Sequence, residues 1–149
     1  MVPKTLQEND QQESLPRVRD DELDFDENLT YYHRGTKFTG IGYEEDPVHG
    51  LSEITYQDGR QSGPARDWFP SGQLKGESTY HNNMLNGISR EFREDGSLIS
   101  ESYYDRGVKV SSVSYDNDGK IISRYKIAQN DPSYAAVEKF RNPPGTSQG

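Results

Sequence analysis

Apolar and polar residues alternate along the middle of the chain, and turn residues interrupt this alternation about every 12 positions. Segments 74–80 and 98–104 follow Gly72 and Gly96, respectively. The residues at alternate positions of the first segment are similar in character to those at the equivalent positions of the second. A period of two between turn residues is typical of β-strands. We therefore predict strands at residues 29–34, 37–43, 52–57, 60–69, 73–81, 84–93, 97–105, 108–116 and 120–127.

Tyrosine recurs every 24 residues, and turn residues recur with it. The repeated tyrosines are Tyr32, Tyr56, Tyr80 and Tyr104, and each is followed three residues later by a turn position, at Gly35, Gly59, Asn83 and Gly107. Glycine also marks midway turns at positions 72, 96 and 119, whereas segment 44–51 departs from this pattern and reads as an altered midway turn. Glycine and asparagine supply the positive φ that tight hairpins need. The period predicts tandem β-hairpin repeats over residues 29–128.

Equivalent residues of successive repeats are expected to stack one strand pair apart, as ladders on one face of an elongated, single-layer antiparallel sheet. The fold class we predict is thus mostly β, with a short C-terminal helix. The predicted structural spine consists of Tyr56, Trp68, Leu74, Tyr80, Phe92, Leu98, Tyr104, Tyr115 and Ile121. We assign these residues to packing and not to catalysis.

The C-terminal region, residues 129–149, changes to a helical pattern. Asp131 is a suitable N-cap and Pro132 suits the first helical position. Tyr134, Val137 and Phe140 then fall close to one helical stripe. We predict a capping helix at about residues 132–141 on the last strands, followed by a loose tail.

The charge of the chain lies mainly in its N-terminal region. The net charge is −8, and residues 1–28 contribute −6 of it, with three basic and nine acidic side chains. We predict a flexible acidic arm over residues 1–28, which serves as a solubilising tail or as a docking arm. In a third alternative, Leu23 and Phe25 cap the first repeat. The candidate partner-binding residues of the arm are Asp20, Asp21, Glu22, Asp24, Phe25 and Asp26.

A second set of candidate partner-binding residues occupies the strand positions that alternate with those of Leu74, Leu98 and Ile121. On the predicted sheet these residues share the face away from the spine. Binding surfaces combine a few aromatic or arginine anchors with a polar rim, and this face offers both kinds of residue. The candidates are Lys75, Glu77, Ile99, Glu101, Tyr103 and Arg124.

No constellation for catalysis or metal binding is recognisable in the sequence. The chain has no cysteine, and its three histidines, at positions 33, 49 and 81, are too widely spaced along the repeats to share one metal ion. Phosphate-binding loops and nucleophile elbows are not found. We expect no enzymatic activity, no metal and no cofactor. The acidic balance disfavours nucleic acid as a partner, and neither a signal peptide nor a membrane span is recognised, so we expect a cytoplasmic location.

The repeat units themselves resemble a known family. Segments 56–63, 69–77 and 80–87 (Tyr-Gln-Asp-Gly-Arg-Gln-Ser-Gly, Phe-Pro-Ser-Gly-Gln-Leu-Lys-Gly-Glu and Tyr-His-Asn-Asn-Met-Leu-Asn-Gly) look like the MORN-repeat variant found in bacteria, and the resemblance covers about residues 30–127. Short bacterial chains of this kind are similar to antitoxin or immunity proteins. The resemblance implies a protein that binds and neutralises a cognate toxin. Because the chain is acidic, we expect a toxin with a basic active-site region. Since a rigid ladder with a flexible arm can fill a cleft, we expect neutralisation by occlusion of that active site.

Two other functions remain open at this point: a scaffold that mediates protein–protein contacts, and a lipid-binding surface. Anionic lipid would repel the acidic arm, which disfavours the second. The chemistry of the toxin (a nuclease, an ADP-ribosyltransferase or another effector), the face that meets it, the choice between occlusion and allosteric inhibition, and the oligomeric state are not readable from the residues.

Overall fold

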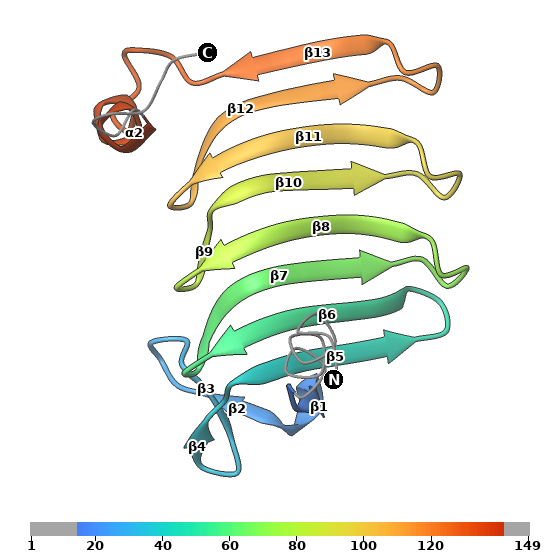
Figure 1. Cartoon of the computed structure of the whole chain (residues 1–149), viewed down its shortest axis with the longest axis vertical. Coiled ribbons are helices and arrows are strands. Elements are labelled where there is room, and N and C mark those ends of the chain that lie inside the picture. The colour runs from blue at the N-terminus through green and yellow to red at the C-terminus, as the bar shows by residue number, and fades with distance from the viewer. Residues whose placement is uncertain (1–14, 142–149) are drawn as a thin grey trace, which may run out of the picture.

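A single large sheet dominates the protein (Figure 1). The computed structural model describes residues 15–141. Neighbouring strands follow the order β1-β5-β6-β7-β8-β10-β11-β12-β13, and the short strand β9 (Met84–Leu85) pairs with β8. The bounds are β1 Arg17–Arg19, β5 Gly40–Asp46, β6 Gly50–Gln57, β7 Arg60–Trp68, β8 Leu74–His81, β10 Gly87–Phe92, β11 Leu98–Asp105, β12 Val108–Tyr115 and β13 Ile121–Lys126. Every pair in this order is antiparallel except β1–β5, which confirms the predicted repeat architecture from β6 onward.

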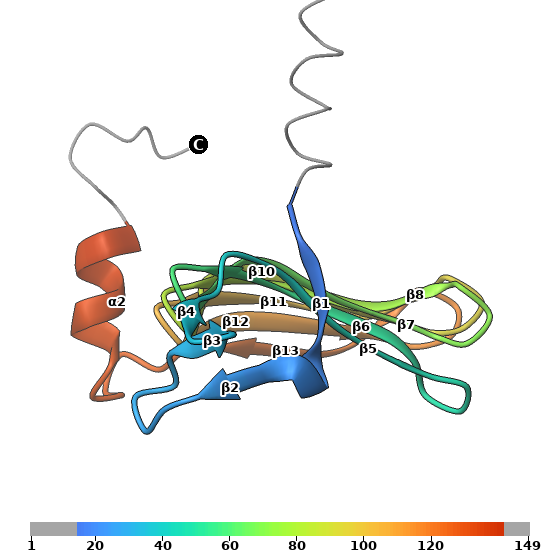
Figure 2. The same ribbon diagram turned by 90° about the horizontal axis from the view of Figure 1, so that it is seen from below.

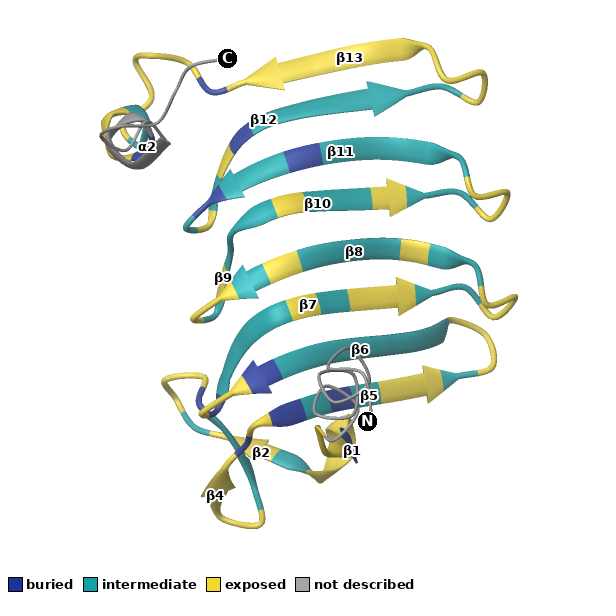
Figure 3. Ribbon diagram, viewed as in Figure 1, coloured by how far each residue is buried: buried dark blue, intermediate teal, exposed yellow. Residues whose placement is uncertain are grey.

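Figure 2 shows this sheet edge-on as one layer, with no second layer over its middle strands among the described residues. The hydrophobic core is accordingly small and divided. Among the residues whose burial the structure describes, six hydrophobic residues are buried, in two clusters that lie near the two ends of the sheet. Figure 3 shows the consequence, because most of the strands between the ends are only half-buried. The middle of the sheet is therefore stabilised by strand pairing and by cross-strand side-chain contacts.

The first cluster covers the N-terminal end of the sheet. It contains Val18, Phe38 and Tyr56, with Leu23, Tyr31 and Ile54 packed against them. The backbone approaches closely here, and a Cβ on Gly42 would lie 2.9 Å from the Tyr56 ring and 2.8 Å from Asp20 Oδ1. Real Cβ atoms do not come so close, so only glycine allows this N-terminal segment to lie against β5.

The prediction of a flexible arm is wrong for the residues that form the N-terminal end of the sheet. Arg17–Arg19 forms β1, which pairs in parallel with β5. A 3₁₀ turn, η1 (Asp20–Glu22), leads into β2 (Leu23–Phe25), which pairs with β3 (Tyr31–His33). Burial of Val18 and packing of Leu23 on the cluster hold the segment in place. The third alternative fits Leu23, whereas Phe25 is 65% exposed. The part of the arm before residue 15 lies outside the described residues.

The first predicted hairpin also differs from the expectation. β3 and β4 (Thr36–Lys37) form a separate three-stranded sheet with β2, and do not start the large sheet. Asp26 stabilises the turn before β3, since its Oδ1 accepts the backbone N–H of Thr30 and its Oδ2 accepts the hydroxyl of Tyr32. These hydrogen bonds, the one from the Thr30 backbone first, lower the pKa of Asp26. A residue expected to bind a partner is thus part of a turn.

The second cluster confirms the predicted C-terminal helix. Helix α2 (Tyr134–Arg141) begins two residues later than predicted and packs Val137 against Val110 and Ile127. Asp131 caps the preceding turn, because its Oδ1 accepts the Ser133 N–H at 2.8 Å. The side chain of Phe140 and the tail after Arg141 lie outside what the structure describes.

The predicted spine does not lie on one face. In β7, Asp67 is the register partner of Gly76, yet Trp68 is the partner of Leu74, so Lys75 is an extra residue in a β-bulge. Similar shifts occur beside Phe92 and Tyr115. Two-residue alternation breaks at each bulge. The ladder of Trp68, Phe92 and Tyr115 therefore lies on the face opposite to Tyr80 and Tyr104, and of all the spine residues only Tyr56 is buried.

Candidate protein-binding groove

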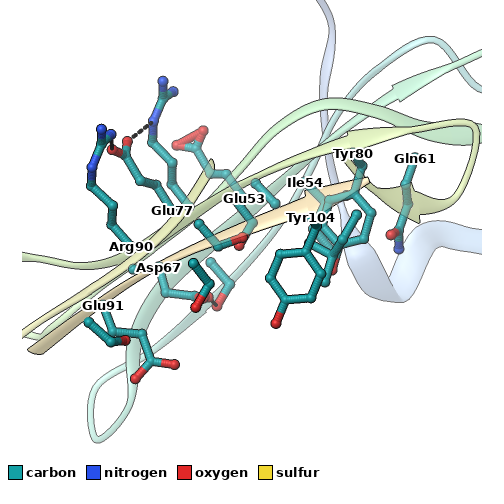
Figure 4. Close-up of a pocket in the computed structure, with 18 of the residues that line it drawn as sticks. Glu53, Ile54, Gln61, Asp67, Glu77, Tyr80, Arg90, Glu91 and Tyr104 are labelled. Atoms are coloured by element: carbon teal, nitrogen blue, oxygen red, sulfur yellow. Dashed lines mark hydrogen bonds and ion pairs between the residues drawn. The ribbon is translucent and has the colours of Figure 1, made fainter. Parts of the chain in front are cut away.

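One face of the sheet carries a row of alternating charges, and we call it the ladder face. Register partners follow one another across five strands, and side chains of directly paired residues point to the same side. The row runs through Glu53, Arg66, Glu77, Arg90 and Glu101. Figure 4 shows Glu77 and Arg90 on this side of the sheet, facing one another.

The charges of the ladder face neutralise one another. Arg90 Nε lies 2.7 Å from a Glu101 carboxylate oxygen, and Arg90 Nη1 lies 3.2 Å from Glu77. Arg66 lies 3.7 Å from Glu77, and Arg17 lies 2.8 Å from Glu53. The hydrogen bonds to Glu101 and then to Glu77 raise the pKa of the Arg90 guanidinium. Glu77 and Glu101, two of the residues expected to meet a partner, are engaged within the chain.

Reversing the central charge is expected to destabilise the sheet. Arg90→Glu would place three carboxylates side by side, and we expect the free energy of unfolding to fall by about 1 kcal/mol. The effect is kept small because the Arg90 side chain is 40% exposed and water screens the pairs. Urea unfolding would measure it, and adding Glu101→Arg to the variant should restore part of the loss. An Arg90→Glu protein as stable as the parent would show that the ladder contributes nothing.

The other predicted residues of this set do not form one site. Lys75 Nζ lies 5.6 Å from the Phe69 ring centre, and Tyr103 packs on the C-terminal cluster. Ile99 is the extra residue of the bulge beside Phe92. Arg124 is the register partner of Val113, whose partner on the other side is Glu101, so it extends the charged row to β13. In the N-terminal set, Asp20, Asp21 and Glu22 lie in η1, and Asp24 lies in β2 with Phe25.

A groove of about 640 Å³ is lined mainly by residues of the opposite face, which we call the groove face, and also by Glu53, Arg66, Glu77 and Arg90 of the charged row. Its floor is made of small residues: Ala65 and Ser78 are register partners, as are Ser89, Ser102 and Ser112 in turn, and Ser78 and Ser89 lie next to the paired residues Glu77 and Arg90. Seven serines line the groove: the four in its floor, and Ser52, Ser100 and Ser114. Small side chains on one face leave the backbone accessible, so a large group can approach the sheet closely.

Two of the groove serines donate their hydroxyl groups in hydrogen bonds within the groove. The Ser102 hydroxyl donates to Ser112 Oγ at 3.0 Å, and the Ser52 hydroxyl donates to Asp67 Oδ1 at 2.5 Å. Ser89 Oγ, in contrast, is buried and has no hydrogen-bond partner among the described residues. A buried hydroxyl without a partner costs free energy. The floor of the groove thus retains an unused hydrogen-bonding group.

The two sides of the groove differ in chemistry. Tyr80 and Tyr104 line one side, and Asp67 and Glu91 line the other, as Figure 4 shows for all four side chains. Glu44 continues the acidic side, since it shares the register row of Ser52, Asp67 and Gly76. Within residues 15–141 neither Glu44 nor Glu91 forms an ion pair, in contrast to the carboxylates of the ladder face.

Asp20 adds a further carboxylate at the N-terminal end of the groove. Its pKa is raised, first by partial burial and then by the negative charges of Glu44 and Asp21. Mutual repulsion of this kind indicates an excess of negative potential, which a cationic group would relieve. Of the residues predicted to bind a partner, Asp20 is one that the fold brings to the groove.

The described residues offer no setting for a metal ion, since no three His, Cys, Asp or Glu side chains gather closely enough to hold one. Over the same range no helix has the length and apolar character needed to cross a membrane. Sequence reasoning missed the serines of the groove. Their alternation with charged residues was a usable signal.

Comparison with known proteins gives one informative match. Residues 61–82 and 85–106 match the family model described as MORN repeat variant. No curated protein matches the chain. Among solved structures, the Glycosylation Associate Protein (Gap123) complex from Streptococcus agalactiae is similar with 19% identity over 61% of this chain and 17% of that chain, at a TM-score of 0.37.

Two further structures are similar to the same degree. Accessory secretory protein 1, 2 and 3 of Streptococcus pneumoniae gives 9% identity over 77% of this chain and 20% of that chain, at a TM-score of 0.37. TarM of S. aureus gives 15% identity over 85% and 22%, at a TM-score of 0.34. The chain spans at most 20% of the length of the first two structures. At these TM-scores the likeness carries no conclusion about function. The family match, together with the strand register, shows that the centre of the sheet is built from two tandem repeats of the MORN variant type.

Proposed function

We propose that this chain binds a partner protein in the groove, and that the partner is a toxin effector which binding neutralises. The observation that carries the proposal is the contrast between the two faces. Charges on the ladder face are paired within the chain, whereas Glu44 and Glu91 of the groove have no ion-pair partner among the described residues and lie in the same groove as the half-buried Tyr80 and Tyr104. MORN-type repeats are suited to scaffolds for protein–protein contacts, which supports the coarser part of the proposal.

The dimensions of the groove suit an α-helix. Tyr80 and Gly76, which mark its two sides on β8, are four residues apart, or about 13 Å along a strand. A helix with its side chains is about 10–12 Å wide. An extended chain is narrower and would not reach both sides at once.

The spacing along the groove fits the same occupant. Glu44, Asp67 and Glu91 lie on every second strand, which corresponds to steps of about 9.6 Å. Seven residues of a helix rise about 10.5 Å. A partner helix with Lys or Arg at every seventh position would therefore meet successive carboxylates, and apolar residues with the same interval would meet Tyr80 and Tyr104.

The toxin identity of the partner is supported by the resemblance of the repeats to antitoxin and immunity proteins. A helix held in the groove and drawn from the active-site region of the toxin would occlude that site. A basic region is a suitable target, because the groove is acidic. We place this activity in the cytoplasm and expect the chain itself to have no enzymatic activity.

Co-expression tests the proposal. We expect the neighbouring reading frame to be lethal when expressed alone and tolerated with this chain, and we expect the tagged chain to retain its product. The groove variant Asp67→Lys/Glu91→Lys should bind the partner about 100-fold more weakly, because two carboxylates are replaced by cations that repel the basic residues of the partner. Titration calorimetry would measure the affinity.

The control changes the same charge elsewhere. Glu94→Lys/Asp118→Lys alters two carboxylates in turns outside the groove, and we expect its affinity to stay within about threefold of the parent. A harmless neighbour would remove the toxin part of the proposal and leave the scaffold function. Equal affinity of both double variants would show that the groove does not bind the partner.

A further inference from the structure

The C-terminal edge of the sheet is a separate surface. Among residues 15–141, strand β13 is paired with β12 only, and it is the last strand of the sheet. All six of its residues are exposed, as Figure 3 shows, and no described element lies beyond it in Figure 1. Helix α2 packs near the end of the strand, on Ile127 and Val110, and leaves the edge itself uncovered.

Alternate residues of β13 present their backbone groups outward. Ile127 donates its N–H to the Val110 carbonyl, so its backbone faces β12. In an antiparallel strand the facing direction alternates. Ser123 and Tyr125 therefore face β12, and Arg124 and Lys126 direct N–H and C=O groups away from the sheet, whereas Ile122 is the extra residue of the bulge beside Tyr115. These are the groups that pair with an added strand.

The opposite edge is protected in a way that β13 is not. β1 covers Ile41–Tyr43 of β5, and the Ile41 N–H is bonded to the Pro16 carbonyl. Past Tyr43, β5 continues beyond β1 through Glu44, Glu45 and Asp46, and charged side chains are a usual means of keeping an edge unpaired.

The side chains of β13 indicate the chemistry of the added strand. Residues 119–130 contain three basic residues, Lys120, Arg124 and Lys126, and no acidic residue. Lys109 adds a fourth cation, with its Nζ 5.7 Å from the Tyr125 ring centre. Ile122 is 65% exposed between these charges. Two copies paired through β13 would bring these cations together, which disfavours a second copy of the chain.

We infer that β13 is a strand-addition site that takes an extended, acidic segment of a partner protein, in which carboxylates alternate with apolar residues. The added strand would bond to the outward groups of Arg124 and Lys126, and its carboxylates would lie near the side chains of the same two residues. This surface is separate from the groove and does not depend on the function proposed for it.

A synthetic peptide tests the inference on the full-length chain. The probe is an end-blocked, eight-residue peptide of alternating Glu and Val, added at about 1 mM in low salt. We expect amide hydrogen exchange at Arg124 and Lys126 to slow by about tenfold or more, because pairing protects exposed amides. The same peptide with Lys in place of Glu should give no protection, and high salt should reduce the effect of the Glu peptide.

Two variants separate backbone pairing from charge. Arg124→Pro removes an outward N–H without touching the bonds to β12, a place where an edge strand tolerates proline. It should abolish protection at Lys126, whereas Arg124→Ala should weaken binding only a few-fold. Lack of protection by the Glu peptide, or equal protection by the Lys peptide, would overturn the inference. It would also be overturned if the chain alone formed oligomers with these amides protected, since the edge would then serve a second copy.

Discussion

Replacing Tyr56 with alanine is expected to lower the free energy of unfolding by about 3–5 kcal/mol. Tyr56 is 2% exposed and lies at the centre of the N-terminal cluster. Its ring centre is 4.8 Å from that of Tyr31 and 5.7 Å from that of Phe38. Removing the ring leaves a cavity between the large sheet and the small one, and the segment that holds β1 and β2 has little other apolar contact to compensate. Chemical denaturation followed by circular dichroism would measure the loss.

Two other substitutions serve as controls. Burial, followed by the nearby charges of Asp20 and Tyr31, raises the pKa of the Tyr56 phenol still further above neutral pH. Tyr56→Phe keeps the buried ring and should therefore cost much less than Tyr56→Ala. Tyr80 occupies the equivalent position in the next repeat but lines the open groove, and Tyr80→Ala should cost about 1 kcal/mol. A similar loss for Tyr56→Ala and Tyr80→Ala would mean that the N-terminal cluster is not a distinct core.

The second large effect is expected at the other end, where Val137→Asp should release helix α2 without unfolding the sheet. Val137 is 2% exposed against Val110 and Ile127. A buried, unpaired carboxylate costs several kcal/mol, so the helix would separate instead of remaining packed. An isolated helix of eight residues is marginal in water and should then unwind. Hydrogen exchange should show protection lost by more than about 100-fold over α2, with little change in β6 to β8.

A graded control accompanies this variant. Val137→Ala keeps the helix apolar and should loosen it only partly. If Val137→Asp instead unfolded the sheet as completely as Tyr56→Ala, the two clusters would belong to one cooperative unit, contrary to the separation seen in the structure. The prediction rests on strand pairing, because β12 is held by β11 on one side and by β13 on the other.

Much of the sheet was predictable because it repeats. Tyr56, Tyr80 and Tyr104 marked the period, and glycines with positive φ, such as Gly59 and Gly107, occupy the turns at which they were expected. The register errors have one cause. A β-bulge adds one residue to a strand, as Lys75 does in β8. Counting alternate residues across the bulge then assigns the residues beyond it to the wrong face of the sheet. A bulge has no sequence signature that counting alternate residues could detect.

The candidate site was less predictable than the fold. Glu77 and Glu101 were chosen as exposed charges, but their cross-strand partner Arg90 was not considered, because pairing depends on the register of three strands. The serines of the groove carried no chemical signal one by one. Ser78, Ser89 and Ser102 form a surface only when three strands align them.

The sequence by itself determined the local events: a 24-residue period, hairpin turns at Gly and Asn, and a helix after Asp131. These follow from backbone preferences that act within a few residues. Tertiary structure alone decided which residues share a face, that Val18 and Leu23 close the N-terminal end, and that the charges of one face are paired while those of the groove are not. Each of these depends on residues far apart in the chain, which come into contact only through the register and the bulges of the folded sheet.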